Sequence, residues 1–280
     1  MKSIYSSEKL IILIVIAMVF TLFPKYQVKA QEDLSSLISI ENQLKEELKK
    51  DNIVLKNLDI STEELTIKTT LKTVDDNLAE ATIEVTPGSN IMKLFTTEVD
   101  ELGETLSAEY IIKINEFEND EFEATIVDLV TGEEFEYNSE EGTASFAFLI
   151  PIGIAMTPAI LTALFHTGAM ILVGGAAYVV ANQAKRSKDY NHFAAVVQSG
   201  TVYHGGGLSK AQAVTRIKSG NDTWSTSSNQ AKGVASSANP NGQPINEVDQ
   251  LNGKPKKGYY YHWHPYKRTP KAHAFYGNPV

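Results

Sequence analysis

The chain has 280 residues, of which 42% are hydrophobic and 21% are charged, so it is long enough for two modest domains with buried cores. It contains no cysteine, and this excludes a disulfide framework, thiolate metal sites and cysteine nucleophiles.

The net charge of −9 conceals an asymmetry along the chain. Residues 31–143 hold 29 Asp and Glu against 8 Lys, whereas residues 183–280 hold 13 Lys and Arg against 4 acids. The acidic part repels nucleic acid, and the basic part attracts it. Three interpretations stay open: the basic part meets phosphate, the two parts shield each other, or both are simply solvated faces.

Residues 1–30 have the pattern of a secretory signal peptide. Two lysines precede an apolar run from Leu10 to Phe23, and Val28 and Ala30 supply the small residues that a cleavage site requires. We therefore predict cleavage after Ala30 and export of the chain. The alternative is an uncleaved N-terminal anchor.

The acidic part is predicted to be a β-rich domain over residues 31–143. Leucines and isoleucines at helical spacing predict an amphipathic helix over 33–50. Alternation with period two then predicts strands at 65–71, 81–85 and 122–126, arranged as an antiparallel meander with one solvated face. The acids fall on outward positions and this part has no histidine, so we expect a binding, spacer or inhibitory role.

A stretch of 43 residues, from Gly142 to Ala184, contains no Asp, Glu, Lys or Arg. It has room for two apolar helices, and we predict a transmembrane-type helical hairpin over 144–184. A buried helical hairpin in a soluble domain is the alternative. The positive residues that follow the stretch place the C-terminal part in a cytoplasm after one crossing, whereas two crossings return it to the starting side.

Residues 185–280 are predicted to form a small basic α+β domain. Residues 190–203 are expected to supply a helix and a short strand. Ser209 has the position of an N-cap for a helix that ends before Gly220, and a second short helix is expected to start near Thr226 or Ser227. The Asn, Gly, Pro and Lys-rich segment 239–257 is predicted to be a loop.

The densest chemistry lies in the last 23 residues. A strand through the sequence Tyr-Tyr-Tyr-His-Trp-His places His262 and His264 on one face and aromatic rings on the other. A second strand around Phe275 is expected to pair with it and to bring His273 alongside the two histidines. Three cations, Lys267, Arg268 and Lys271, lie in the connecting loop.

Such a group suits RNA cleavage without a metal. One imidazole takes the 2′-hydroxyl proton, another donates a proton to the leaving oxygen, and Lys or Arg stabilises the charge on phosphorus. Aromatic rings offer stacking platforms for unpaired bases. The alternatives are a surface hairpin of structural His, Tyr and Trp, and a three-histidine zinc site with an open position. Magnesium is disfavoured because the basic part has only four acids.

The order of these features resembles a family of secreted toxins from Gram-positive bacteria. The resemblance is carried by the signal peptide, the acidic β-rich region and the Pro- and Gly-marked hydrophobic segment. It is carried further by the Gly-Asn-Asp-Thr-Trp-Ser sequence from Gly220, the Tyr-Tyr-Tyr-His-Trp-His-Pro sequence and the His-Ala-Phe-Tyr-Gly sequence from His273. In such polymorphic toxin systems, which serve bacterial competition, the C-terminal module is usually the toxic one and is often an RNase.

The resemblance implies roles for individual residues. His262, His264 and His273 are the acid and base candidates, Lys267 and Arg268 the phosphate clamps, and Tyr261 a helper. It also implies RNA as substrate and an immunity protein as partner, while no cofactor is expected.

The sequence thus predicts an exported, membrane-associated α+β protein whose C-terminal domain cleaves RNA. Two other functions remain open. One is a cell-envelope protein that binds a polymer or partner without catalysis, and the other is a pore-forming toxin that acts through the hydrophobic hairpin.

Overall fold

The computed structural model describes residues 40–72, 78–99, 103–118, 121–138, 151–182, 184 and 189–280. The predicted signal peptide, 1–30, and the start of the hydrophobic stretch therefore lie outside the described residues. The mixed α+β class is confirmed, with strands predominating.

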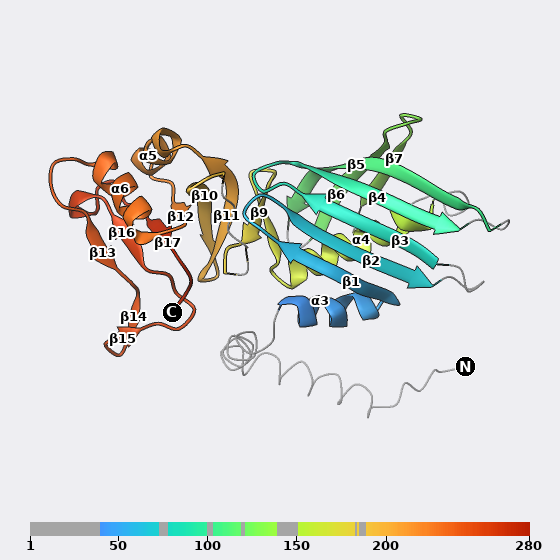
Figure 1. Ribbon diagram of the computed structural model, residues 1–280, viewed down its shortest axis with the longest axis horizontal. Coiled ribbons are helices and arrows are strands. Elements are labelled where there is room, and N and C mark those ends of the chain that lie inside the picture. The colour runs from blue at the N-terminus through green and yellow to red at the C-terminus, as the bar shows by residue number, and fades with distance from the viewer. Residues whose placement is uncertain are drawn as a thin grey trace, which may run out of the picture. The chain divides into compact units, whose positions relative to one another are not determined.

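Seven antiparallel strands form the acidic part, in the order in which they follow one another along the chain (Figure 1). They are β1 Ile53–Ile60, β2 Leu65–Lys72, β3 Leu78–Val85, β4 Ile91–Val99, β5 Thr105–Glu118, β6 Glu121–Asp128 and β7 Glu134–Asn138. The predicted meander is confirmed. The alternation with period two arises because one face of each strand is buried and the other is partly exposed. Leu65 and Ile67 on β2, and Ile83 and Val85 on β3, are completely buried, while the residues between them are partly exposed.

The predicted N-terminal helix is present as α3, Ile40–Lys49. Its inward positions, Leu44 and Leu48, are fully buried, as helical spacing requires. Residues 43–280 form one compact unit, and of the preceding unit only the first residues of α3 are described.

The helical hairpin predicted for 144–184 is wrong in its second half. One helix, α4 Ile152–His166, is followed by two antiparallel strands, β8 Met170–Val173 and β9 Ala176–Val180. Gly174 and Gly175 join the strands with positive φ angles of 58° and 78°, the backbone that a two-residue hairpin turn needs. Among the described residues, no helix is both long and apolar enough to cross a membrane.

Close packing holds α4 against the seven-stranded sheet. The helix contacts β3 and β4, and the backbone N–H of Ile152 donates to Oε2 of Glu98 at 3.0 Å. A Cβ atom on Gly153 would lie 2.4 Å from Cγ2 of Thr96, so only glycine fits there. Nearby, the turn after β3 bonds to β9, because Gly88 donates to the carbonyl of Ala177 at 2.7 Å.

The second sheet has eight strands in the order β13-β16-β17-β12-β10-β11-β9-β8. The strands not yet given are β10 His192–Gln198, β11 Thr201–Leu208, β12 Thr223–Ser225, β13 Ile245–Glu247, β16 His262–His264 and β17 Ala274–Tyr276. All pairs are antiparallel except β12 with β17. The sequence prediction of a helix within 190–203 is therefore wrong, because both halves of that segment are strands.

The segment 239–257, predicted as a loop, also contains strands. It holds β13 and a small separate pair, β14 Gln250–Leu251 and β15 Lys254–Pro255. These strands are two or three residues long, too short to show a period in the sequence.

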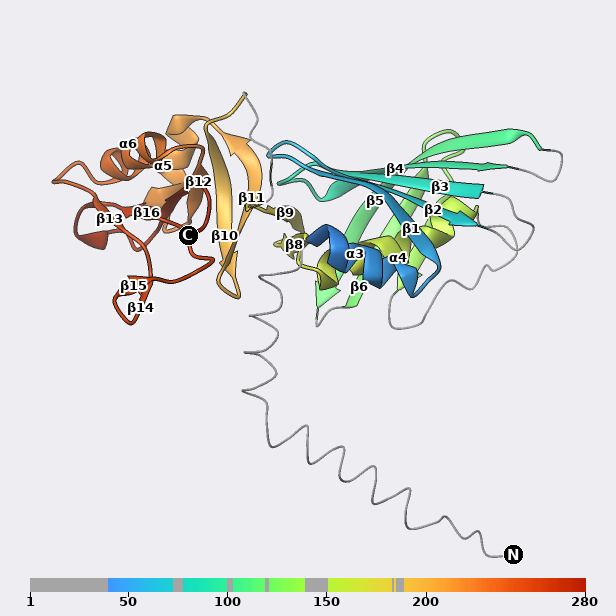
Figure 2. The same cartoon turned by 60° about the horizontal axis from the view of Figure 1, so that its bottom comes forward.

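Two helices pack on one face of the second sheet (Figure 2). They are α5 Lys210–Lys218 and α6 Ser228–Ala238. Both start where the sequence predicts: Ser209 forms a capping box with Gln212, and the Ser227 hydroxyl accepts from the backbone of Gln230.

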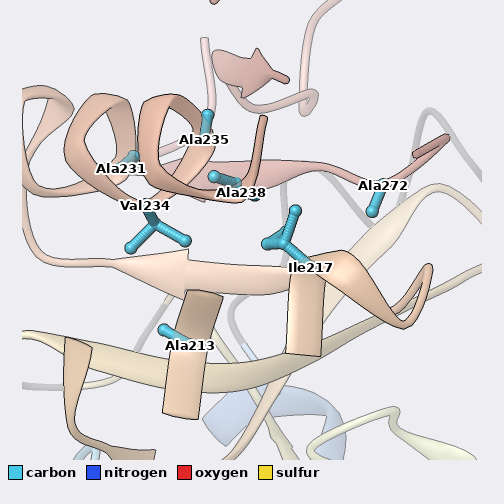
Figure 3. Close-up of a cluster of buried hydrophobic side chains, with 8 residues drawn as sticks. Ala213, Ile217, Ala231, Val234, Ala235, Ala238 and Ala272 are labelled. Atoms are coloured by element: carbon cyan, nitrogen blue, oxygen red, sulfur yellow. The ribbon is translucent and has the colours of Figure 1, made fainter. Parts of the chain in front are cut away.

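The core between α5, α6 and the sheet is made mainly of alanines, which let the helices approach closely. Figure 3 shows these side chains gathered together. The buried members are Ala213, Ile217, Ala231, Val234, Ala235, Ala238, Ala272 and Ala274. Because Ala272 is completely buried here, the backbone just before β17 is fixed, and this matters for the site described next.

Candidate functional site: a cluster of three histidines

Four neighbouring strands bring the site together at one end of the second sheet. His262 and His264 lie on β16, and His273 directly precedes β17, the antiparallel partner of β16. Glu247, the last residue of β13, is paired with His262 across the other edge of β16. Asp222 directly precedes β12, which runs parallel to β17.

The three imidazole rings are in mutual contact. Their centroids are 5.0 Å apart for His262 and His264, 4.9 Å for His262 and His273, and 4.7 Å for His264 and His273. One ring nitrogen of each lies within 4.8 Å of the others. The sequence prediction that the second strand brings His273 beside the other two histidines is thus confirmed.

Strand alternation separates this cluster from the helices. Trp263, between the two histidines of β16, packs against the α5–α6 core and donates its indole N–H to the Ser228 hydroxyl. His262 and His264 point the other way, where Phe275 lies 5.4 Å from the His262 ring centre. They are nearly inaccessible, at 3% and 6% exposure, while His273 is half-buried.

Each histidine is held by its Nδ1 atom. The Nδ1 of His262 lies 3.1 Å from the carbonyl oxygen of Tyr260, and that of His264 lies 3.2 Å from the carbonyl oxygen of Ala272. The Nδ1 of His273 lies 2.9 Å from Oδ1 of Asp222. Carbonyl and carboxylate oxygens only accept, so all three Nδ1 atoms carry the proton and the Nε2 atoms are left for chemistry.

Glu247 reaches the cluster from β13. Its Oε1 lies 2.9 Å from Nε2 of His264 and 3.8 Å from Nε2 of His262. Its Oε2 accepts from the guanidinium of Arg268 at 2.5 Å. Arg268 thereby fixes the carboxylate and, by hydrogen bonding, lowers the pKa of Glu247, so that it is ionised at neutral pH.

Asp222 positions His273 with one oxygen. Its Oδ1 accepts both from Nδ1 of His273 and from the backbone N–H of the same residue, at 2.7 Å for the latter. The parallel pairing of β12 with β17 places the two residues opposite each other. The ring of His273 therefore has one preferred orientation and tautomer.

The surroundings shift the pKa values of the histidines in opposite directions. Burial lowers the pKa of His262, and burial together with the neighbouring His273 and His262 lowers the pKa of His264. Burial also acts to lower the pKa of His273, but the hydrogen bond and charge of Asp222 outweigh it and the pKa is raised.

The predicted phosphate clamps lie in the turn between β16 and β17, within the 3₁₀ helix η1 Tyr266–Arg268. Lys267 and Arg268 are exposed and have φ angles of 55° and 52°, a region that costs energy for residues other than glycine. Arg268 is bound to Glu247, and Nζ of Lys267 lies 5.3 Å from the ring centre of Tyr266. Both cations thus lie close in sequence to the clustered histidines, and Arg268 contacts the cluster through its ion pair with Glu247.

Tyr261, the predicted helper, belongs to an aromatic pair. Its ring stacks on Tyr276 with 6.2 Å between centroids, and Tyr276 packs against the α5–α6 core. The Tyr276 hydroxyl is held by Asn246, whose Nδ2 donates to it at 3.0 Å. Tyr261 is 37% exposed and offers a flat surface beside the strand that carries the histidines.

The other three histidines have different surroundings. His192 and His204 are buried on β10 and β11, where His192 contacts the Ser225 hydroxyl and His204 packs against Phe193 and Trp224. His166 is exposed at the end of α4. A cavity of about 580 Å³ lies beside α4, lined in part by His166 and Met156, and none of the clustered histidines lines it. Its lining also includes Glu47, Lys50 and Asp51, but it has a single histidine, so we take the group of three imidazoles in mutual contact as the candidate site.

Sequence reasoning missed Glu247 and Asp222 as site residues. Both lie far from the histidines along the chain and in short segments without periodicity. A clue was present, because they are two of only four acids in residues 183–280. In a basic segment, an isolated acid is a candidate partner for a histidine or arginine.

No protein-family model, curated protein or solved structure matches this chain.

Proposed function

We propose that this protein is an exported toxin whose C-terminal part cleaves RNA at the three-histidine cluster, without a metal. The observation that supports the proposal best is the convergence of His262, His264 and His273, which each have one ring nitrogen within 4.8 Å of the others and a hydrogen-bond partner at Nδ1.

The reaction would use two of the three imidazoles. One Nε2 accepts the proton of a 2′-hydroxyl, whose oxygen attacks phosphorus. A second imidazole donates its proton to the 5′ oxygen as the P–O5′ bond breaks, which leaves a 2′,3′-cyclic phosphate and a 5′-hydroxyl. Each of these proton transfers contributes about 10² to 10⁴ in rate.

The supporting residues have roles that follow from their contacts. The hydrogen bond and charge of Asp222 raise the pKa of His273, so this ring holds a second proton on Nε2 more readily than its neighbours and is the natural proton donor. Lys267 and Arg268 provide positive charge at the turn beside the cluster, where it would stabilise the charge on the phosphoryl oxygens. Tyr261 offers its exposed ring to an unpaired base.

The other parts of the chain would serve to export the protein and to inhibit the C-terminal part until it is released. Export through residues 1–30 stays a prediction from the sequence. Membrane association through 144–184 also stays a prediction, and it would require α4, β8 and β9 to leave the sheets on which they pack. In the proposed domain layout, the acidic domain of 31–143 covers or restrains the basic domain of 185–280 until release. An immunity protein would protect the producing cell.

The test is RNA cleavage by the purified full-length chain and by residues 168–280, which retain every strand of the second sheet. Each is incubated with single-stranded RNA in the presence of EDTA, and the ends of the products are analysed. We expect cyclic-phosphate ends with the wild type and a loss of at least about 100-fold in rate for His262→Ala. His166→Ala is the matched control, because this histidine is exposed and lies at the end of α4.

Intact RNA with a folded wild-type protein would refute the proposal. It would favour the envelope-binding function instead, whereas leakage of dye from liposomes caused by the chain would favour the pore-forming function.

A further inference from the structure

The three histidines turn their second ring nitrogens toward one another, and each offers a lone pair there when its ring is neutral. Their Nδ1 protons are committed to Tyr260, Ala272 and Asp222, so each neutral ring has an unprotonated Nε2. The ionised Glu247 adds an oxygen 2.9 Å from Nε2 of His264. Four acceptors that face one another repel unless a cation lies among them, and this cation is either a proton on one imidazole or a bound metal ion.

The dimensions suit a single ion. Zinc binds imidazole nitrogen at about 2.0–2.1 Å, so two nitrogens of a tetrahedral zinc site lie about 3.3–3.4 Å apart. One ring nitrogen of each histidine lies within 4.8 Å of the others, so the rings would have to rotate inward to close around one ion. Imidazole ligands select zinc and its transition-metal neighbours over magnesium and calcium, which prefer oxygen.

The outer contacts are those of a metal site. Histidines that bind metals generally donate the other ring N–H to a carboxylate or a backbone carbonyl, which fixes the ring and increases its basicity. All three members of the cluster have such a partner. Two of the rings are almost completely buried on β16, so burial restricts how far these two ligands can move when an ion binds.

Glu247 determines what kind of site this is. Arg268 binds its Oε2 and leaves Oε1 directed at the histidines. With this oxygen as fourth ligand the tetrahedron is closed, and closed sites are structural, whereas catalytic zinc sites keep an open position.

We propose that His262, His264, His273 and Glu247 bind one divalent transition-metal ion of the zinc class, and that the bound ion silences the cluster by occupying the nitrogens that would transfer protons. The silencing, but not the binding, rests on the proposed RNA cleavage. The bound metal then inhibits RNA cleavage, and a chelator that removes the metal restores the activity.

Binding is tested directly on the purified full-length chain. Zn²⁺ is titrated in competition with a chromophoric chelator, and Co²⁺ is added separately as a spectroscopic probe. We expect one ion per chain and the visible absorption of tetrahedral Co²⁺. The affinity should fall more than about 100-fold in His264→Ala, and about 10- to 100-fold in Asp222→Asn, which removes only an outer contact. His166→Ala should bind like the wild type, and melting temperatures show whether each variant is folded.

The results separate this inference from the proposed function. Stoichiometric binding that depends on His264, with RNA cleavage only after EDTA treatment, supports both. RNA cleavage without metal binding overturns the inference and leaves the function standing. Cleavage that requires Zn²⁺ overturns the silencing and the metal-free reaction, but keeps the site. Metal binding that survives His264→Ala in a folded protein overturns the site.

Discussion

His204 lies on β11 with none of its surface exposed, and its Nε2 has no hydrogen-bond partner. Burial lowers the pKa of His204 to about 4, compared with about 6.5 for a free imidazole. Between these two values the unfolded chain binds a proton that the folded chain does not. The free energy of unfolding therefore has its full value above pH 6.5 and falls as the pH drops toward 4.

The replacement His204→Leu tests this directly. The wild type should lose about 3 kcal/mol of stability from this residue between pH 7 and pH 4, and the variant should lose correspondingly less. Urea denaturation at several pH values measures the difference. Equal pH dependence in both proteins would show that His204 is accessible to protons in the folded state.

Among the elements, the hairpin of β8 and β9 differs most from the sequence prediction, and a glycine substitution distinguishes the two structures. Gly174 has φ 58° and no atom within 4 Å of a Cβ placed on it, so Gly174→Ala affects only the backbone. In this hairpin we expect a loss of about 1–2 kcal/mol, whereas in a helix the same change would add about 1 kcal/mol. The sign of the change in the urea midpoint decides between the two.

Gly233 in α6 is the matched control for this prediction. It is in a helix and its added Cβ would meet only the flexible end of Lys210 at 3.6 Å. Gly233→Ala should therefore stabilise the protein by up to about 1 kcal/mol. Stabilisation by both substitutions would contradict the hairpin.

The sequence predicts elements that have a hydrophobic pattern repeated over several residues or a helix cap. It does not predict elements that depend on pairing with a strand distant in the sequence. Ser209 and Ser227 each mark a helix start through a local hydrogen bond, and the alternation of Leu65 and Ile67 reflects one buried face. The apolar segment that forms β8 and β9 has no charged residue and no clear hydrophobic period, so its composition fits a helix as well as a buried strand. Only its pairing with β11 decides the outcome.

The residues of the candidate site also fall into those that the sequence predicts and those that it does not. The three histidines could be found because a single hairpin, β16 with β17, brings them together. Glu247 and Asp222 reach them through β13 and β12, whose pairing depends on the whole sheet. Site residues contributed by non-local strand pairs are therefore the ones that a single sequence conceals.

At the scale of the whole molecule, the separation of charge along the chain predicts how binding to RNA depends on salt. Each cation that contacts a phosphate of single-stranded RNA contributes about −0.7 to the slope of log affinity against log salt concentration. Lys267 is exposed at the turn beside the histidines, whereas Lys68 on β2 is paired with Glu80 at 3.1 Å in the acidic sheet.

The change Lys267→Gln should therefore make the slope less steep by about 0.7, and Lys68→Gln should leave it unchanged. Fluorescence anisotropy with labelled RNA between about 50 and 200 mM salt measures both slopes. Equal slopes in all three proteins would mean that RNA does not reach the turn that carries Lys267, and the phosphate-binding role of this turn would be wrong even if the basic part still attracts RNA elsewhere.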